Sequence, residues 1–115
     1  MNPNIEIREC SPPVKNTASS SDDMVTIAQV FWKGAHLLDV AYCTEDYYKD
    51  IPAFKGEVHK RWTLYAAKSL PLLHFLQGSF LTREAAEAEV PRIVKDWENM
   101  LRTMWFRPKV KTVNS

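Results

Sequence analysis

The chain has 115 residues, a formal net charge of +1, and 45% hydrophobic and 25% charged residues. This length suits one domain with its own core, and the composition excludes disordered, fibrous and collagen-like chains. Only three glycines occur, and their scarcity favours helices over a turn-rich β architecture. We therefore expect an all-α protein, a small bundle of four or five helices with a flexible N-terminal arm.

The near-zero net charge hides an asymmetry along the chain. Residues 1–57 hold five Lys or Arg against nine Asp or Glu, a net charge of −4, and residues 58–115 hold ten against five, a net charge of +5. This distribution fits either charge complementarity between packed elements or a dipolar surface that orients a partner.

The chain carries no obvious targeting or membrane segment. Its first residues lack the basic start and the apolar stretch of a secretory signal, and the longest uncharged run, residues 69–82, is too short to cross a bilayer. Its two cysteines, Cys10 and Cys43, do not make a disulfide framework. We expect a cytoplasmic protein.

The N-terminal segment, residues 1–22, is predicted to be a disordered tail, because it is rich in proline and serine and poor in apolar groups. Ile5 and Ile7 alternate with Glu6 and Arg8. That alternation leaves a short strand, or a segment that orders on binding, as the alternative.

The first helix is expected from about Asp23 to Tyr42, after a serine- and aspartate-rich start. Its apolar residues point in nearly every direction around the axis, which is typical of a helix at the centre of a fold or covered by another subunit. The β-branched and aromatic residues within 24–33, followed by Gly34, fit a strand as well. Helix and strand therefore both remain open over 24–33.

Further helices are predicted in the middle of the chain. A short one begins at Thr44 and ends near Asp50, and an amphipathic one covers residues 57–70. Pro71 should kink or break the second helix, and Gly78 suits the position that closes it.

The last helical stretch has the clearest signals. Thr82 can cap it, Pro91 should split it into a short and a longer piece, and Pro108 should end it. The predicted helical domain thus covers residues 23–107, with a basic and polar C-terminal tail over 108–115. Apolar residues recur here at alternating steps of four and three: Val90, Val94, Trp97, Leu101 and Met104.

Signals for enzymatic chemistry are weak. His36, His59 and His74 lie on different segments and form none of the spacings typical of metal ligands. Cys43 has no histidine at a spacing that indicates a nucleophile and its base, and the chain has no glycine-rich phosphate loop. We expect no enzyme, no metal and no cofactor.

The leading functional hypothesis is a non-enzymatic regulator, adaptor or inhibitor that binds another protein, or itself as a homodimer. Aromatic residues, methionine and arginine are enriched where proteins meet, and they are concentrated near the end of this chain. Core packing explains part of the same pattern, so the two interpretations stand side by side. The predicted contact residues are Trp97, Met100, Leu101, Arg102, Met104, Trp105, Phe106 and Arg107.

The alternative hypothesis is a nucleic-acid-binding regulator. Two basic clusters could bind a phosphate backbone, with aromatic residues nearby to stack on bases. The sequence pI of about 7.8 is low for such a protein. The candidate residues are His59, Lys60, Arg61, Lys109 and Lys111.

Overall fold

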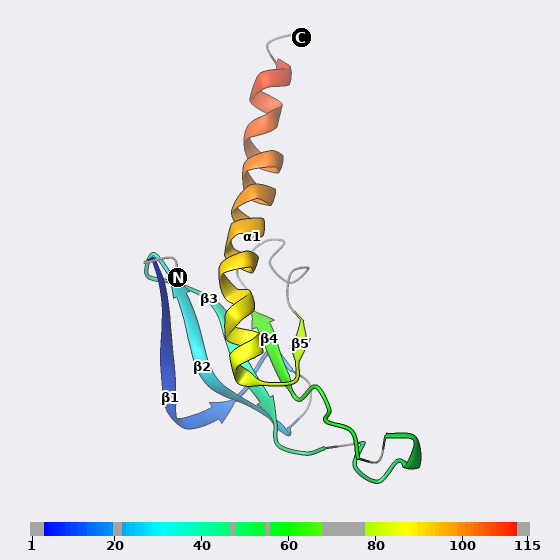
Figure 1. Ribbon diagram of the computed structural model, residues 1–115. Coiled ribbons are helices and arrows are strands. Elements are labelled where there is room, and N and C mark those ends of the chain that lie inside the picture. The colour runs from blue at the N-terminus through cyan, green and yellow to red at the C-terminus, as the bar shows by residue number, and fades with distance from the viewer. Residues whose placement is uncertain (1–3, 20–21, 47, 55, 68–77, 113–115) are drawn as a thin grey trace.

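The computed structural model describes residues 4–19, 22–46, 48–54, 56–67 and 78–112, with side chains characterised up to position 103 except at Phe54. The described residues form a five-stranded antiparallel sheet in the order β1-β2-β3-β4-β5, followed by one long helix, α1. Figure 1 shows α1 lying against one face of the sheet and continuing past its end. The protein is therefore α+β, and the prediction of an all-α bundle of four or five helices is wrong.

The largest correction concerns residues 23–42, which form a hairpin of β2 (Met24–Trp32) and β3 (Ala35–Cys43) instead of a helix. Lys33 and Gly34 join the strands with φ angles of 50° and 82°. Positive φ at both positions is the geometry of the tightest hairpin turns. Side chains of β2 alternate between buried and half-buried. The strands thus carry apolar groups on both faces of the sheet. In the sequence, this pattern is similar to that of a helix that is apolar on all sides.

Strand β1 (Ile5–Lys15) replaces most of the predicted disordered tail. It pairs antiparallel with β2, from Ile5 opposite Trp32 to Lys15 opposite Val25, with an irregularity between Glu9 and Val14. Pairing with β2 supplies the backbone hydrogen bonds and apolar contacts that the segment lacks by itself. The prediction of a flexible N-terminal arm is therefore wrong for the residues of β1.

The predicted helix over 57–70 is also wrong, because residues 62–66 form β4 (Trp62–Ala66), which pairs with β3. The predicted helix over 44–50 is replaced by turns, and a single turn of 3₁₀ helix, η1 (Pro52–Phe54), follows. Gly78 precedes the short β5 (Ser79–Phe80) and closes no described helix. The expected break at Pro71 lies outside the described residues.

Helix α1 (Arg83–Thr112) begins where the capping signal predicted. The Ala85 amide donates to Thr82 Oγ1 at 3.0 Å, which confirms Thr82 as the cap. The helix then continues through Pro91 and Pro108, so the predicted split and the predicted C-terminal end are both wrong. Each proline lacks an amide hydrogen, so one helical hydrogen bond is not made at each position.

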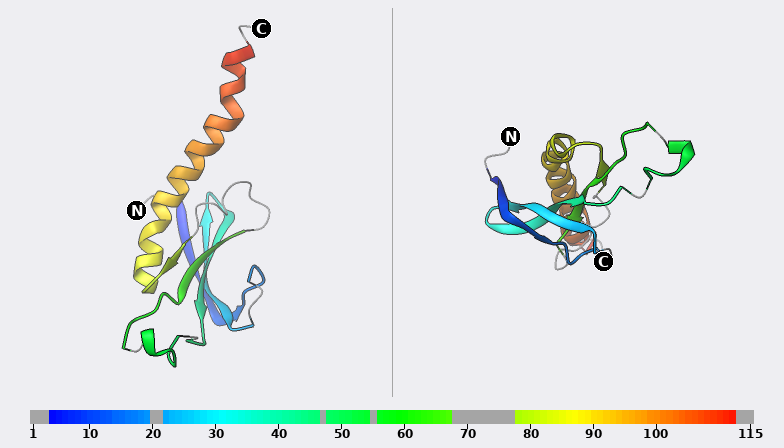
Figure 2. Two further views of the ribbon diagram at one scale, coloured as in Figure 1. Left: turned by 90° about the vertical axis from the view of Figure 1, so that its right-hand side faces the viewer. Right: turned by 90° about the horizontal axis from the view of Figure 1, so that it is seen from below.

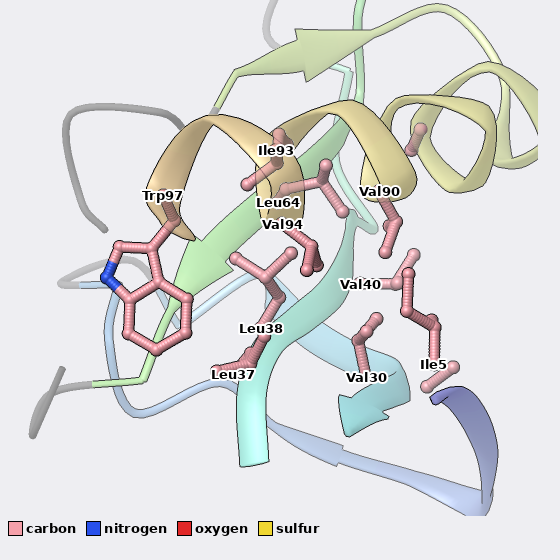
Figure 3. Close-up of a cluster of buried hydrophobic side chains, with 12 residues drawn as sticks. Ile5, Val30, Leu37, Leu38, Val40, Leu64, Val90, Ile93, Val94 and Trp97 are labelled. Carbon is pink, nitrogen blue, oxygen red and sulfur yellow. The ribbon is translucent and has the colours of Figure 1, made fainter. Parts of the chain in front are cut away.

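The core lies between α1 and the sheet. Figure 3 shows Val90 of α1 directed at Val40 and Val94 beside Leu38 of the sheet, and Figure 2 shows the helix packed against one sheet face only. The buried cluster has members from β1, β2, β3, β4 and α1: Ile5, Ala28, Val30, Leu37, Leu38, Val40, Leu64, Ala86, Val90, Ile93, Val94 and Trp97.

Candidate functional site

Helix α1 divides into two parts by what lies beneath it. The sheet-bound part, residues 83–101, ends with Leu101, which is half-buried against the core. The projecting part, residues 102–112, begins with the exposed residues Arg102 and Thr103 and extends beyond the sheet (Figure 1). The predicted contact residues are distributed over both parts.

The start of the sheet-bound part is tied to β1 and to its own next turn. The Arg83 guanidinium bonds both carboxylate oxygens of Glu9 and also donates from Nε to Glu87 at 2.5 Å. This guanidinium holds the pKa of Glu9 below its ordinary value, and the two carboxylates raise the pKa of Arg83. Arg83 therefore fixes the position of the helix start over the sheet.

Trp97 belongs to the core. Its side chain is only 6% exposed, and its ring meets the Trp32 ring edge-on with centroids 5.7 Å apart. Trp97, which the sequence analysis named as a contact residue, is therefore not on the surface of the described structure. Met100 and Leu101 are half-buried at the end of the sheet-bound part.

The remaining predicted contact residues stand on the projecting part. Thr103 is exposed and its hydroxyl donates to the Asn99 carbonyl at 2.8 Å, within the helix. The helical backbone continues through Met104, Trp105, Phe106 and Arg107, whose side chains lie outside the described part of the structure. Residues 102–112 include four cations and no acid: Arg102, Arg107, Lys109 and Lys111.

The basic cluster at residues 59–61 is largely engaged inside the protein. The Asp46 carboxylate contacts His59 Nδ1 at 2.9 Å with both oxygens, which lowers the pKa of Asp46. Arg61 donates from Nε to the Cys43 carbonyl at 3.1 Å and from Nη2 to the Thr44 carbonyl at 3.0 Å. These two side chains therefore hold the loop after β3 and have little capacity left for a phosphate.

The two basic clusters also lie far apart. Residues 59–61 are next to the loop at one end of the sheet, and Lys109 and Lys111 are near the C-terminal end of α1 (Figures 1 and 2). The backbone positions of the two clusters are therefore at different ends of the molecule (Figures 1 and 2).

A cleft of about 420 Å³ adjoins His59. Val58 in its wall is 75% exposed, and the hydroxyl of Ser79 lies 3.4 Å from that of Thr63. The site is open, and it does not combine the apolar walls and converging polar groups typical of small-molecule pockets. Its lining residues are Tyr48, Glu57, Val58, His59, Lys60 and Ser79.

A second histidine–carboxylate pair lies in the sheet. His36 Nε2 is 2.7 Å from Asp39 Oδ1, and Asn16 Nδ2 donates to Asp39 Oδ2 at 3.4 Å and to Thr26 Oγ1 at 2.9 Å. Asn16 is 1% exposed, and its Oδ1 accepts two amides of the following turn. The network joins the turn that follows β1 to β2 and β3, which is a structural role.

His36 and His59 thus contact different carboxylates, and His74 lies outside the described residues. Within the described ranges, the structure brings together no group of three or more metal-ligating side chains. In those same ranges no helix has the length and apolarity needed to span a membrane.

Sequence analysis missed the carboxylate partners in these contacts. Asp46 precedes His59 by 13 positions, and Glu9 precedes Arg83 by 74. Neither separation leaves a local pattern, because both contacts depend on the tertiary fold.

Comparisons with known proteins add no relative. No protein-family model matches the chain, and neither the curated proteins nor the solved structures contain a match.

Proposed function

We propose that this chain is a non-enzymatic protein-binding regulator, adaptor or inhibitor, and that the projecting part of α1 is its contact segment. Its partner is an acidic protein with an apolar groove that receives the helix. The observation that carries the proposal is the continuation of α1 beyond its last core residue, Leu101.

The projecting part continues beyond the described sheet, which supports the rest of α1 (Figure 1). Residues 102–112 span roughly 16 Å, or about three turns, and isolated helices of this length are marginal in water. Most helical stability comes from packing of an apolar face. A partner that covers this segment would supply that packing.

The sequence of the projecting part is suited to such a partner. Met104 continues the spacing of Trp97 and Leu101, and Trp105 and Phe106 follow directly. Large aromatic and methionine side chains are the usual anchors of a helix bound in a groove. The same side chains would be costly to leave in water on a monomer.

Charge defines the chemistry of the partner. The projecting part carries four cations and no acid, so a groove with an acidic rim complements it and a basic surface does not. Arg102 and Arg107 flank the aromatic anchors in the sequence, where they would meet that rim.

Site-specific crosslinking in the full chain tests this proposal. Benzoylphenylalanine replaces Thr103 in one variant and Lys95, exposed on the sheet-bound part, in a control. In an extract of the producing organism, we expect a discrete adduct with one acidic protein at position 103 only. Trp105→Ala should abolish it and weaken binding of the purified partner by about 30-fold or more, which is typical of an anchor.

Control experiments distinguish a protein partner from other ligands of the projecting part. Equal adducts at positions 95 and 103, or an adduct that survives both Trp105→Ala and the double reversal Arg102→Glu/Arg107→Glu, would contradict the proposal. Anionic phosphatidylserine vesicles and a single-stranded oligonucleotide serve as further probes. If either binds more tightly than any protein and needs the arginines but not Trp105, the segment is a polyanion-binding element and the protein-groove proposal is wrong.

A further inference from the structure

Strand β1 is at the edge of the sheet, because the strand order of the described residues begins with it. Edge strands present backbone donors and acceptors that can pair with another strand. Pro12 and Pro13 limit this edge at one end, since proline has no amide to donate. The usable edge is therefore the regular stretch that pairs with β2 from Ile5 to Glu9.

One hydrogen bond at the start of β1 shows which of its residues direct their backbone groups toward β2, a pattern that we call its backbone parity. The Lys33 amide donates to the Asn4 carbonyl at 2.9 Å, and Asn4 and Lys33 are opposite each other in the register that pairs Ile5 with Trp32. In an antiparallel ladder, alternate residues direct their amide and carbonyl to the same side. Glu6 and Arg8 therefore face β2, and the backbone groups of the odd-numbered residues from Ile5 to Glu9 face the open edge.

The side chains next to this edge are self-complementary. Glu6 and Arg8 are both exposed, with side chains 58% and 51% accessible, and they form an ion pair of 2.8 Å along the strand. Ile7, between them, packs half-buried against the edge of the core.

We propose that β1 pairs antiparallel with β1 of a second copy of this chain about a two-fold axis at Ile7, so that two sheets join into one. In this register Ile7 is opposite Ile7, and Ile5 is opposite Glu9. These are the residues whose backbone groups face the edge. Glu6 of each copy is then opposite Arg8 of the other, on the sheet face away from α1.

Charge excludes the neighbouring registers that keep the same backbone parity. A shift of the axis to Glu6 places Glu6 opposite Glu6, and a shift to Arg8 places Arg8 opposite Arg8. Like charges directly opposite each other destabilise a strand pair. Backbone parity thus allows all three of these registers, and charge selects the one centred on Ile7.

The interface is separate from the projecting part of α1, and it does not depend on the proposed function. Sedimentation or native mass measurement of the full chain should give a dimer, twice the chain mass of 13.3 kDa, with a concentration-dependent equilibrium. Glu6→Arg and Arg8→Glu should each remain monomeric, because each of the three registers considered above then opposes like charges. Circular dichroism should match that of the native chain, since both side chains are more than half exposed.

Mixing the two variants is the decisive step. Glu6→Arg carries two cations at the edge and Arg8→Glu carries two acids, so the mixture should form a heterodimer although neither variant self-associates. The double variant Glu6→Arg/Arg8→Glu should dimerise like the native chain. Arg92→Glu, a reversal of an exposed arginine on α1, should leave the dimer unchanged.

Three results would overturn the proposal. The native chain could stay at 13.3 kDa at every concentration. The single variants could dimerise as the native chain does, or fail to combine when mixed. Finally, a dimer that resists both reversals but is lost in Trp105→Ala would place self-association on α1 and not on β1.

Discussion

The two parts of α1 belong to one helix but have different surroundings. In the sheet-bound part, Val90, Val94 and Trp97 are buried between helix and sheet. In the projecting part, Arg102 and Thr103 are exposed, and the same apolar spacing continues with Met104, beyond the strands that the structure describes (Figure 1). A similar apolar spacing is therefore packed on the sheet in one part of the helix and extends past the end of the sheet in the other (Figure 1).

Alanine substitutions at Trp97 and Trp105 compare the two parts of α1 with the same residue type. Trp97→Ala removes a ring that is 6% exposed and packs on Trp32. It should lower the free energy of unfolding by about 3–5 kcal/mol, as for other buried aromatic residues. Urea unfolding of the native chain and the variant measures the change, and a loss below ~1 kcal/mol would show that Trp97 is not part of the core.

The helix cap should have an intermediate effect. Thr82→Ala removes the oxygen that accepts the Ala85 amide, so unfolding should become easier by about 1 kcal/mol. Thr82→Ser, which retains the oxygen, is the control and should recover most of this loss. If both variants unfold like the native chain, the cap does not hold the sheet-bound part.

The link between Glu9 and Arg83 should appear as a dependence of stability on pH. Because Arg83 lowers the pKa of Glu9, the unfolded chain takes up a proton at a higher pH than the folded chain does. The contribution is therefore complete above the ordinary glutamate pKa of about 4.3 and is lost as pH falls through the lowered value. Glu9→Gln should reduce the loss of the free energy of unfolding at acid pH, measured by urea unfolding at a series of pH values. If the native chain and the variant show the same pH dependence, the ion pair does not contribute.

Trp105→Ala should have the smallest effect on stability. Its position lies beyond Leu101 on the projecting part, so the free energy of unfolding of the isolated chain should change by less than about 0.5 kcal/mol, as for surface substitutions. The same urea experiment as for Trp97→Ala gives the comparison. A loss similar to that of Trp97→Ala would mean that Trp105 packs within its own chain.

Local signals were sufficient to predict the start and the buried face of α1, but not its length or the sheet. The Thr82 cap and the spacing of Val90, Val94 and Trp97 depend only on neighbours within a few residues, and both were found in the structure. Strands β2 and β3 pair across a two-residue turn whose Lys33 has a positive φ that residue type does not favour. Because no clear sequence signal marks a turn at Lys33, the apolar residues on both faces of the sheet were interpreted as one helix.

The N-terminal strand shows the other limit. Segment Ile5–Lys15 has too few apolar groups to fold alone, and it becomes ordered through its partner β2. The alternation of Ile5 and Ile7 with charged residues was the only local signal, and it was outweighed by the prolines that follow.

The candidate site was predicted in part. Sequence analysis located a basic, aromatic segment at the end of α1, but it could not separate Trp97 from Trp105, because the end of the sheet near Leu101 is a tertiary feature. It also counted His59 and Arg61 as available cations, whereas Asp46 and backbone carbonyls of the preceding loop engage them.

Hydrogen exchange along α1 of the chain alone compares the two parts residue by residue. Amides from Ile93 to Leu101 should exchange only when the whole domain unfolds, because they belong to the helix packed on the core. Amides from Trp105 to Thr112 should exchange on the order of 100-fold faster or more, because this part of the helix extends past the strands that the structure describes (Figure 1). Equal protection of both parts would mean that the end of α1 is already covered within its own chain, and a contact segment reserved for a partner would then be ruled out.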